Sequence, residues 1–124
     1  MNSALVVGEG FLGCALIDAL AEAGIRVIGS SKDILSSKLY LELTQPIPEL
    51  PLVDVVYICA AVASYRLCEG SQSAWIVNAD SAVSISKQAI DRGMFPIFVS
   101  SDSIEFMSNA YTRMKAYAES CILP

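Results

Sequence analysis

The sequence contains no histidine, and its four cysteines never form a Cys-x-x-Cys pair. Zinc and iron–sulfur sites depend on clusters of these two residue types, so no metal site is expected. The four thiols, at positions 14, 59, 68 and 121, are expected to be buried or half-buried.

Basic residues and long apolar runs are also scarce. Eight Lys and Arg stand against 13 Asp and Glu, a net charge of −5, which leaves no basic stripe for nucleic acid. The longest uninterrupted apolar stretch, residues 55–63, is far shorter than the roughly 20 residues that span a bilayer. The first residues lack the basic segment of a secretory signal, so we expect cytoplasmic residence and no membrane partner.

What the sequence does have is a large apolar share, 54%, with a mean hydropathy of +0.52. Average proteins have about 45–50% apolar residues. A parallel sheet covered on both faces explains part of the excess, because its strands are apolar throughout. For the rest we expect further chain, or a second copy at an exposed sheet edge, to cover apolar surface. The length fits one domain, residues 1–124.

Strand-like and helix-like patterns alternate along the chain. They predict strands at residues 3–7, 26–29, 39–43, 53–61 and 95–100, and helices at residues 10–23, 74–92 and 111–121. Three prolines between the third and fourth strands predict a loop there. Such alternation favours an α/β fold of the Rossmann type, a five-stranded parallel sheet in the order 3-2-1-4-5 with helices on both faces.

A glycine turn, Gly8-Glu9-Gly10-Phe11-Leu12-Gly13, joins the first strand to the first helix. In this pattern the first glycine permits a tight turn, the second lets a pyrophosphate approach the backbone, and the third lets the helix pack closely. The turn predicts a dinucleotide phosphate site that includes Phe11 and Leu12. The alternative is a tight turn that binds nothing.

The end of the second strand bears on which dinucleotide fits. NAD sites of this type place an acid there for the ribose hydroxyls, whereas this chain has Ser30, Ser31 and Lys32. Two hydroxyls and a cation suit a 2′-phosphate, so NADP(H) is the preferred cofactor and NAD(H) the alternative. Asp33 weighs against this preference, and a solvated loop is an equal alternative for the lysine.

Tyr111 and Lys115 lie four residues apart on the last predicted helix and therefore share one face. An ammonium beside a phenol stabilises the tyrosinate, which lets the tyrosine exchange a proton with a substrate hydroxyl or carbonyl. Ser101, expected at the end of the fifth strand, could hydrogen-bond the same oxygen. The alternative for this pair is an amphipathic helix with both side chains exposed.

These motifs, in this order, resemble the N-terminal part of the extended short-chain dehydrogenase/reductase family, which includes nucleotide-sugar epimerases, dehydratases and reductases. Residues 56–61 are similar to the family's fourth strand, whose small residues, here Ala60 and Ala61, lie beside the cofactor. The segments 77–78 and 98–102, together with Glu119 after the tyrosine and lysine, also resemble the family pattern.

The resemblance implies that Ser101, Tyr111 and Lys115 form a catalytic triad, with Lys115 also holding the nicotinamide ribose. It implies hydride transfer on a nucleotide-sugar-like substrate. The family's C-terminal substrate domain has no counterpart in these 124 residues. We therefore expect an enzyme completed by further chain or a partner, or alternatively a non-catalytic dinucleotide-binding or assembly module. Asn78 is expected to cap or kink its helix, and Trp75 to pack in the core.

Overall fold

The computed structural model describes residues 1–33, 39–62, 64–105 and 108–122. Five parallel strands form one sheet in the order β3-β2-β1-β4-β5, which confirms the expected topology. The strands are β1 (Ser3–Val7), β2 (Arg26–Ser31), β3 (Leu39–Tyr40), β4 (Val55–Ile58) and β5 (Phe95–Phe98). The helices are α1 (Phe11–Glu22), α2 (Tyr65–Cys68), α3 (Gln72–Trp75), a π-helical turn (Ile76–Asp80), α4 (Ser81–Asp91), a 3-10 turn (Asp102–Glu105) and α5 (Ala110–Ile122).

Strand β1 is the centre of the sheet, and all five of its residues are buried. It pairs with β2 on one side and β4 on the other, so that Val6 lies opposite both Gly29 and Tyr57. A strand buried on both faces gains from apolar side chains at every position, which explains the apolar run of residues 4–7.

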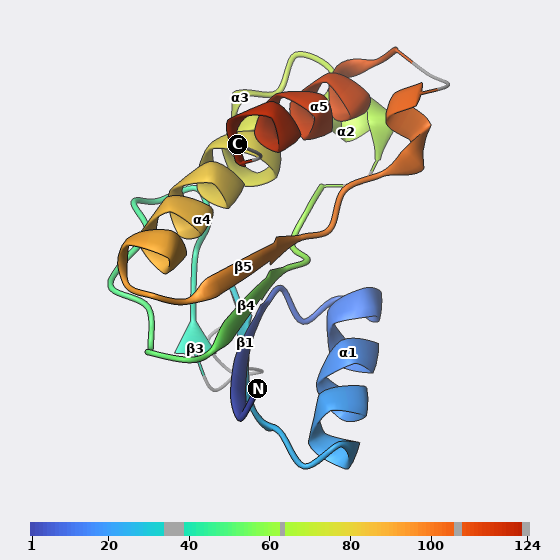
Figure 1. Cartoon of the computed structure of the whole chain (residues 1–124). Coiled ribbons are helices and arrows are strands. Elements are labelled where there is room, and N and C mark those ends of the chain that lie inside the picture. Colours follow the sequence, from blue (N-terminus) through green and yellow to red (C-terminus); the bar gives the residue numbers. More distant parts are fainter. Residues whose placement is uncertain (34–38, 63, 106–107, 123–124) are drawn as a thin grey trace.

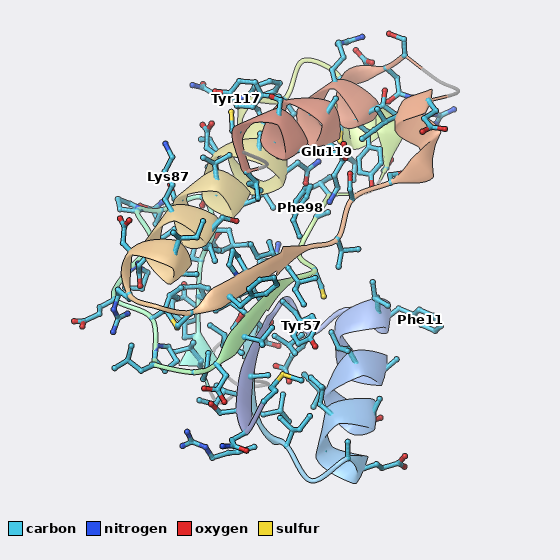
Figure 2. The ribbon with its side chains drawn as sticks, viewed as in Figure 1. Phe11, Tyr57, Lys87, Phe98, Tyr117 and Glu119 are labelled. Atoms are coloured by element: carbon cyan, nitrogen blue, oxygen red, sulfur yellow. The ribbon has the colours of Figure 1, made fainter. Side chains whose placement is uncertain are left out.

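Helices cover both faces of the sheet (Figure 1), as expected, with α1 on one face and α4 and α5 on the other. Tyr57 points from β4 toward the α1 face, whereas Phe98 lies between β5 and the α5 layer (Figure 2). The larger core cluster, built around Leu5, Val56 and Ile85, lies under α4. The smaller one joins Ala4, Val6 and Leu20 under α1.

The long predicted helix at residues 74–92 begins two residues earlier and changes its winding on the way. It consists of α3, the π-helical turn and α4 in unbroken succession. Asn78, within the π-helical turn, is 1% exposed. Its side chain accepts a hydrogen bond from the Val62 main-chain nitrogen at 2.7 Å and donates one to the Val62 oxygen at 2.9 Å. The structural role expected for Asn78 is therefore confirmed, as a tie between this helix and the chain that follows β4.

Several boundaries differ from those predicted. The third, fourth and fifth strands are shorter than expected, because pairing partners are present only over residues 39–40, 55–58 and 95–98. Ser101 therefore lies three residues beyond the end of β5 rather than at it. Helix α2 and the 3-10 turn were not predicted, since elements of four residues carry too few positions for a periodic pattern.

The cysteine expectation was wrong at two positions. Cys14 and Cys121 are exposed, whereas Cys59 is half-buried and Cys68 is fully buried. In the described ranges, no cluster of three potential metal ligands occurs, and no helix has the length and apolarity needed to cross a membrane. Trp75 is half-buried against both the main core and the cluster around Cys68, as expected, with its ring centroid 5.1 Å from that of Tyr117.

We predict that replacing Asn78 by alanine lowers the free energy of unfolding by about 2–4 kcal/mol, because both main-chain groups of Val62 lose their partner. Chemical denaturation measures the loss. Asn2→Ala at an exposed position is the matched control and should stay within about 0.5 kcal/mol of the wild type. Equal stability of the two variants would contradict a structural role for the Asn78 amide.

Candidate functional site

The glycine turn has the geometry of a phosphate cradle. Gly8 has a φ of +101°, and a Cβ on Gly13 would lie 1.8 Å from the Gly8 oxygen, so both positions require glycine. Gly10 is different, because a Cβ there would meet nothing within 4 Å. It is the N-cap of α1 and makes no side-chain cap, which leaves an open approach to the first amides of the helix.

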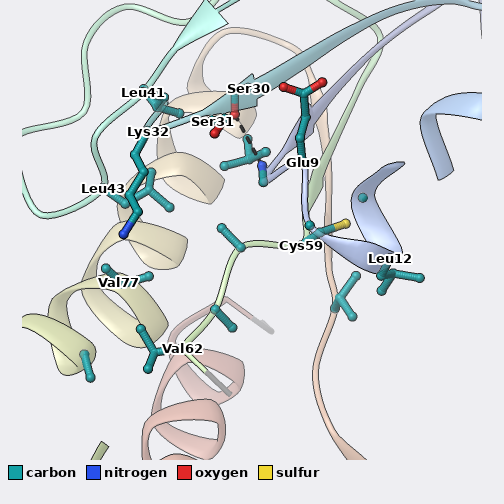
Figure 3. Close-up of a pocket in the computed structure, with 18 of the residues that line it drawn as sticks. Glu9, Leu12, Ser30, Ser31, Lys32, Leu41, Leu43, Cys59, Val62 and Val77 are labelled. Carbon is teal, nitrogen blue, oxygen red and sulfur yellow. Dashed lines mark hydrogen bonds between the residues drawn. The ribbon is translucent and has the colours of Figure 1, made fainter. Parts of the chain in front are cut away.

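This turn is tied to the end of β2. The Gly8 and Glu9 main-chain N–H groups both donate to the Ser30 oxygen, at 3.1 and 3.0 Å. The buried Ser30 hydroxyl accepts a further, longer bond from the Gly8 N–H at 3.4 Å (Figure 3). On the opposite side, Ala60 donates its N–H to the Val7 oxygen at 2.9 Å and fills the space that a Cβ on Gly8 would need.

A cleft of about 740 Å³ opens at the carboxyl ends of these strands (Figure 3). Sites of open parallel sheets occur at this edge, where the strand order reverses. The cleft is lined by the glycine turn (residues 7–13), the end of β2 (30–32), the segment after β3 (41–44), the segment after β4 (59–62), residues 67, 71, 73, 74 and 77, and residues 99, 100, 111 and 115.

Nearly all the predicted site residues therefore line one cleft. They include every expected cofactor-binding residue: Gly8, Gly10, Phe11, Leu12, Gly13, Ser30, Ser31, Lys32, Ala60, Ala61, Tyr111 and Lys115. Phe11 lies at its rim and is 97% exposed. The exception is Ser101, because the wall is formed by its neighbour Ser100.

Lys115 is the most strongly constrained of these side chains. It is 3% exposed, and its ammonium donates to the Val99 oxygen at 2.9 Å. The same nitrogen lies 4.7 Å from the ring centroid of Phe98 and 6.0 Å from that of Tyr111. Burial lowers the pKa of Lys115 from its usual 10.5, and the nearby Cys59 acts weakly in the opposite direction. The ammonium and the phenol are thus held on one wall of the cleft.

Helix α5 is bonded to the end of β5 at a second point. The Ser100 hydroxyl donates to a carboxylate oxygen of Glu119 at 2.8 Å, one helical turn beyond Lys115. Figure 2 shows Glu119 and Phe98 in the space between this helix and the sheet. The two bonds, from Lys115 and to Glu119, hold the helix that carries Tyr111 against adjacent residues of one strand end.

Sequence reasoning missed two carboxylates that line the cleft, those of Glu9 and Glu42. Glu9 stands inside the glycine motif, at a position to which the motif assigns no role. Glu42 accepts bonds from the Thr44 hydroxyl at 2.8 Å and the Thr44 N–H at 3.2 Å. These bonds lower the pKa of Glu42, with a smaller contribution from Lys32. Its position near the end of the third predicted strand was the available signal.

No family model matches this sequence, and neither does any curated protein. Solved structures do match. A dTDP-4-dehydrorhamnose reductase from Yersinia enterocolitica is 23% identical, with a TM-score of 0.76 over 98% of this chain and 48% of its own. A short-chain dehydrogenase/reductase superfamily protein from Agrobacterium tumefaciens with bound NAD is 19% identical, with a TM-score of 0.78 over 98% and 44%.

The fold is the Rossmann-type fold that these structures share. A UDP-glucose 4-epimerase from Thermotoga maritima, solved with UDP-glucose, is also similar in structure, at 20% identity and a TM-score of 0.75 over 95% of this chain and 49% of its own. The chain thus spans about half the length of each of these proteins. The resemblance seen in the sequence motifs is confirmed at the level of the fold.

The geometry of the glycine turn predicts that an alanine is poorly tolerated at position 13 and well tolerated at position 10. Gly13→Ala should lower the free energy of unfolding by about 3 kcal/mol, because the new methyl group collides with the Gly8 oxygen. Gly10→Ala is its matched control, with open space around the new methyl group, and should cost about 1 kcal/mol or less, through the poorer N-cap. Denaturant titration compares the two, and an equal loss would contradict the close approach of α1 to Gly8.

The burial of Lys115 predicts a dependence of stability on pH. Between its lowered folded-state pKa and 10.5, the unfolded chain binds more protons than the folded one, so the free energy of unfolding rises with pH. In Lys115→Met, the free energy of unfolding should lack this increase with pH. Denaturation from pH 8 upward measures it, with the exposed Lys87→Met as the control that keeps the slope. If the free energy of unfolding changed with pH in the same way in the wild type and in Lys115→Met, a lowered pKa of Lys115 would be refuted.

Proposed function

We propose that this chain binds a nicotinamide dinucleotide in its cleft and serves as the cofactor domain, residues 1–124, of an oxidoreductase or epimerase that acts on a nucleotide-sugar-like hydroxyl or carbonyl. The observation that carries the proposal is that the glycine turn and the Tyr111–Lys115 pair line the same cleft. In the similar enzymes, NAD or UDP-glucose is bound, and half of their length lies outside the similarity. Further chain or a partner would complete the substrate site.

The residues present fit a dinucleotide. Gly10 leaves room for a pyrophosphate over the start of α1, where the amides and the helix dipole favour an anion. Ala60 and Ala61, which follow β4 after Cys59, line the cleft with small side chains. When bound, the nicotinamide ring would donate or accept the hydride.

The proton would be handled by this chain's own residues. The Tyr111 phenol exchanges a proton with the substrate oxygen, and the Lys115 ammonium stabilises the tyrosinate that results. Lys115 can hold this position because the Val99 oxygen satisfies one of its three donors and the Phe98 ring faces its charge. Ser101 is retained in the proposal as a hydrogen-bond donor to the substrate oxygen, with Ser100 on the wall beside it.

The proposal includes a preference for one form of the cofactor. Ser30, Ser31 and Lys32 are the basis for NADP(H), with NAD(H) as the alternative. Two of them already have local bonds, because the Ser30 hydroxyl accepts from Gly8 and the Ser31 hydroxyl accepts from the Asp33 N–H at 3.1 Å. Cytoplasmic residence and self-association remain predictions.

A non-catalytic dinucleotide-binding module is the second candidate. The observation in its favour is the wall of the cleft itself, which includes Ser100 but not Ser101, the expected third member of the triad. Under this alternative the glycine turn binds the cofactor and no proton transfer follows.

The test is Tyr111→Phe. We expect the dissociation constant of the dinucleotide to stay within about twofold, while hydride transfer falls by about 100-fold or more, the usual contribution of a general acid or base. Calorimetry measures binding. Cofactor absorbance measures turnover with dTDP-4-dehydrorhamnose, and chromatographic separation of the nucleotide sugars measures epimerisation of UDP-glucose, which leaves the cofactor unchanged.

Tyr117→Phe is the matched control, since Tyr117 lies on the same helix but does not line the cleft. It should leave both quantities unchanged. Undiminished turnover by Tyr111→Phe would remove the proton-transfer role. Cofactor binding without any wild-type turnover would fit both the non-catalytic module and a cofactor domain whose substrate site is completed by further chain or a partner.

A further inference from the structure

The carboxylate of Glu9 lies beside the second strand, next to Gly29 and two residues before the strand ends at Ser31. A Cβ built on Gly29 would be 2.7 Å from Glu9 Oε1 and 2.9 Å from its Cδ. The carboxylate therefore rests directly over Gly29 and occupies the space of that residue's missing side chain. Gly29 immediately precedes Ser30 and Ser31, which line the cleft.

One oxygen of this carboxylate is left without a partner. Within the described part of the chain, Glu9 Oε2 is buried and makes no hydrogen bond, although Glu9 itself lines the cleft and is half-buried. A buried acceptor without a donor is costly, so such an atom calls for an explanation. Because Glu9 as a whole is only half-buried, a rotation of its carboxylate toward the cleft would bring this oxygen to hydroxyl donors of a ligand at this edge.

The ammonium groups of the described cleft residues do not pair with Glu9. The described lining residues include two carboxylates, Glu9 and Glu42, and two ammonium groups, Lys32 and Lys115. Lys115 is bonded to the Val99 oxygen, and the charge of Lys32 contributes to the lowered pKa of Glu42, after the bonds from Thr44. Figure 3 shows the Lys32 ammonium pointing toward Leu43 and Val77, away from Glu9.

We infer that Glu9 accepts hydrogen bonds from the adenosine-ribose hydroxyls of the cofactor and makes the cleft select NAD(H) over NADP(H). In folds of this kind an acid at the end of the second strand performs this role. Here the glycine turn supplies the acid, and Gly29 leaves room for it. A 2′-phosphate at this place would meet a carboxylate instead of a cation and would remove the hydroxyl donor. The inference rests on the proposed function and replaces its preference for NADP(H).

The experiment compares the dissociation constants of NADH and NADPH by calorimetry for the 124-residue chain and three variants. We expect the wild type to bind NADH about tenfold more tightly than NADPH, the effect of one charge-assisted hydrogen bond. Glu9→Gln should reduce this ratio to near one. Gly29→Ala keeps the charge but displaces the carboxylate, and should reduce the ratio in the same direction.

Asp18→Asn is the matched control. It removes one carboxylate from exposed α1 surface outside the cleft, so the ratio should stay within about twofold of the wild-type value. Thermal unfolding establishes whether each variant is folded. If Glu9→Gln does not fold, the ratio measured for Gly29→Ala tests the role of Glu9.

Three results would overturn the inference. NADPH bound as tightly as NADH by the wild type, or a ratio unchanged in the folded Glu9 and Gly29 variants, would reject the role of Glu9 and return the preference to Ser30, Ser31 and Lys32. Both would leave the proposed function standing. A folded wild type that binds neither nucleotide would reject the inference together with the proposed function.

Discussion

The close approach of helix α1 to the end of β1 is the contact on which the cleft depends. The absence of a side chain at Gly13 brings the helix onto the Gly8 oxygen, and the positive φ of Gly8 turns the chain sharply enough to begin that helix. The same turn aims two N–H groups at the Ser30 oxygen, which fixes the end of β2. It also packs Gly8 against Ala60, which fixes the segment after β4. The close approach of Gly13 to Gly8 thus fixes three parts of the cleft: the glycine turn itself, the end of β2 and the segment after β4.

The opposite wall depends on a buried charge. Moving an ammonium out of water is costly, and a fully buried lysine is rare unless its donors and its charge are satisfied. The Val99 oxygen accepts a hydrogen bond from the Lys115 ammonium, and the Phe98 ring lies beside its charge. Both groups belong to the strand end that α5 packs against. The Ser100–Glu119 bond adds a second tie one turn further along. The position of the Tyr111 ring is therefore set by the sheet as well as by its own helix.

The sheet order and the main walls of the cleft followed from the sequence, because glycine spacing and apolar periodicity are local signals. Tyr111 and Lys115 were found in the same way, since a separation of four residues places them on one helical face. What depended on three-dimensional distance was not found. The partner of Asn78 lies 16 residues earlier, and the Glu9 carboxylate reaches a strand 20 residues further along the chain. Ser101 was placed at a strand end because the end of β5 depends on pairing with β4, which stops at Phe98.

The contact between Glu9 and Gly29 constrains how this cleft can change over evolutionary time. A side chain at position 29 would displace the Glu9 carboxylate and Ile17 Cδ1, which are the ends of flexible side chains, so an acid at this strand position and Glu9 in its present position exclude each other. Loss of the Glu9 carboxylate opens that space. The two positions are therefore coupled, and a side chain introduced at residue 29 also changes where the carboxylate of residue 9 can lie.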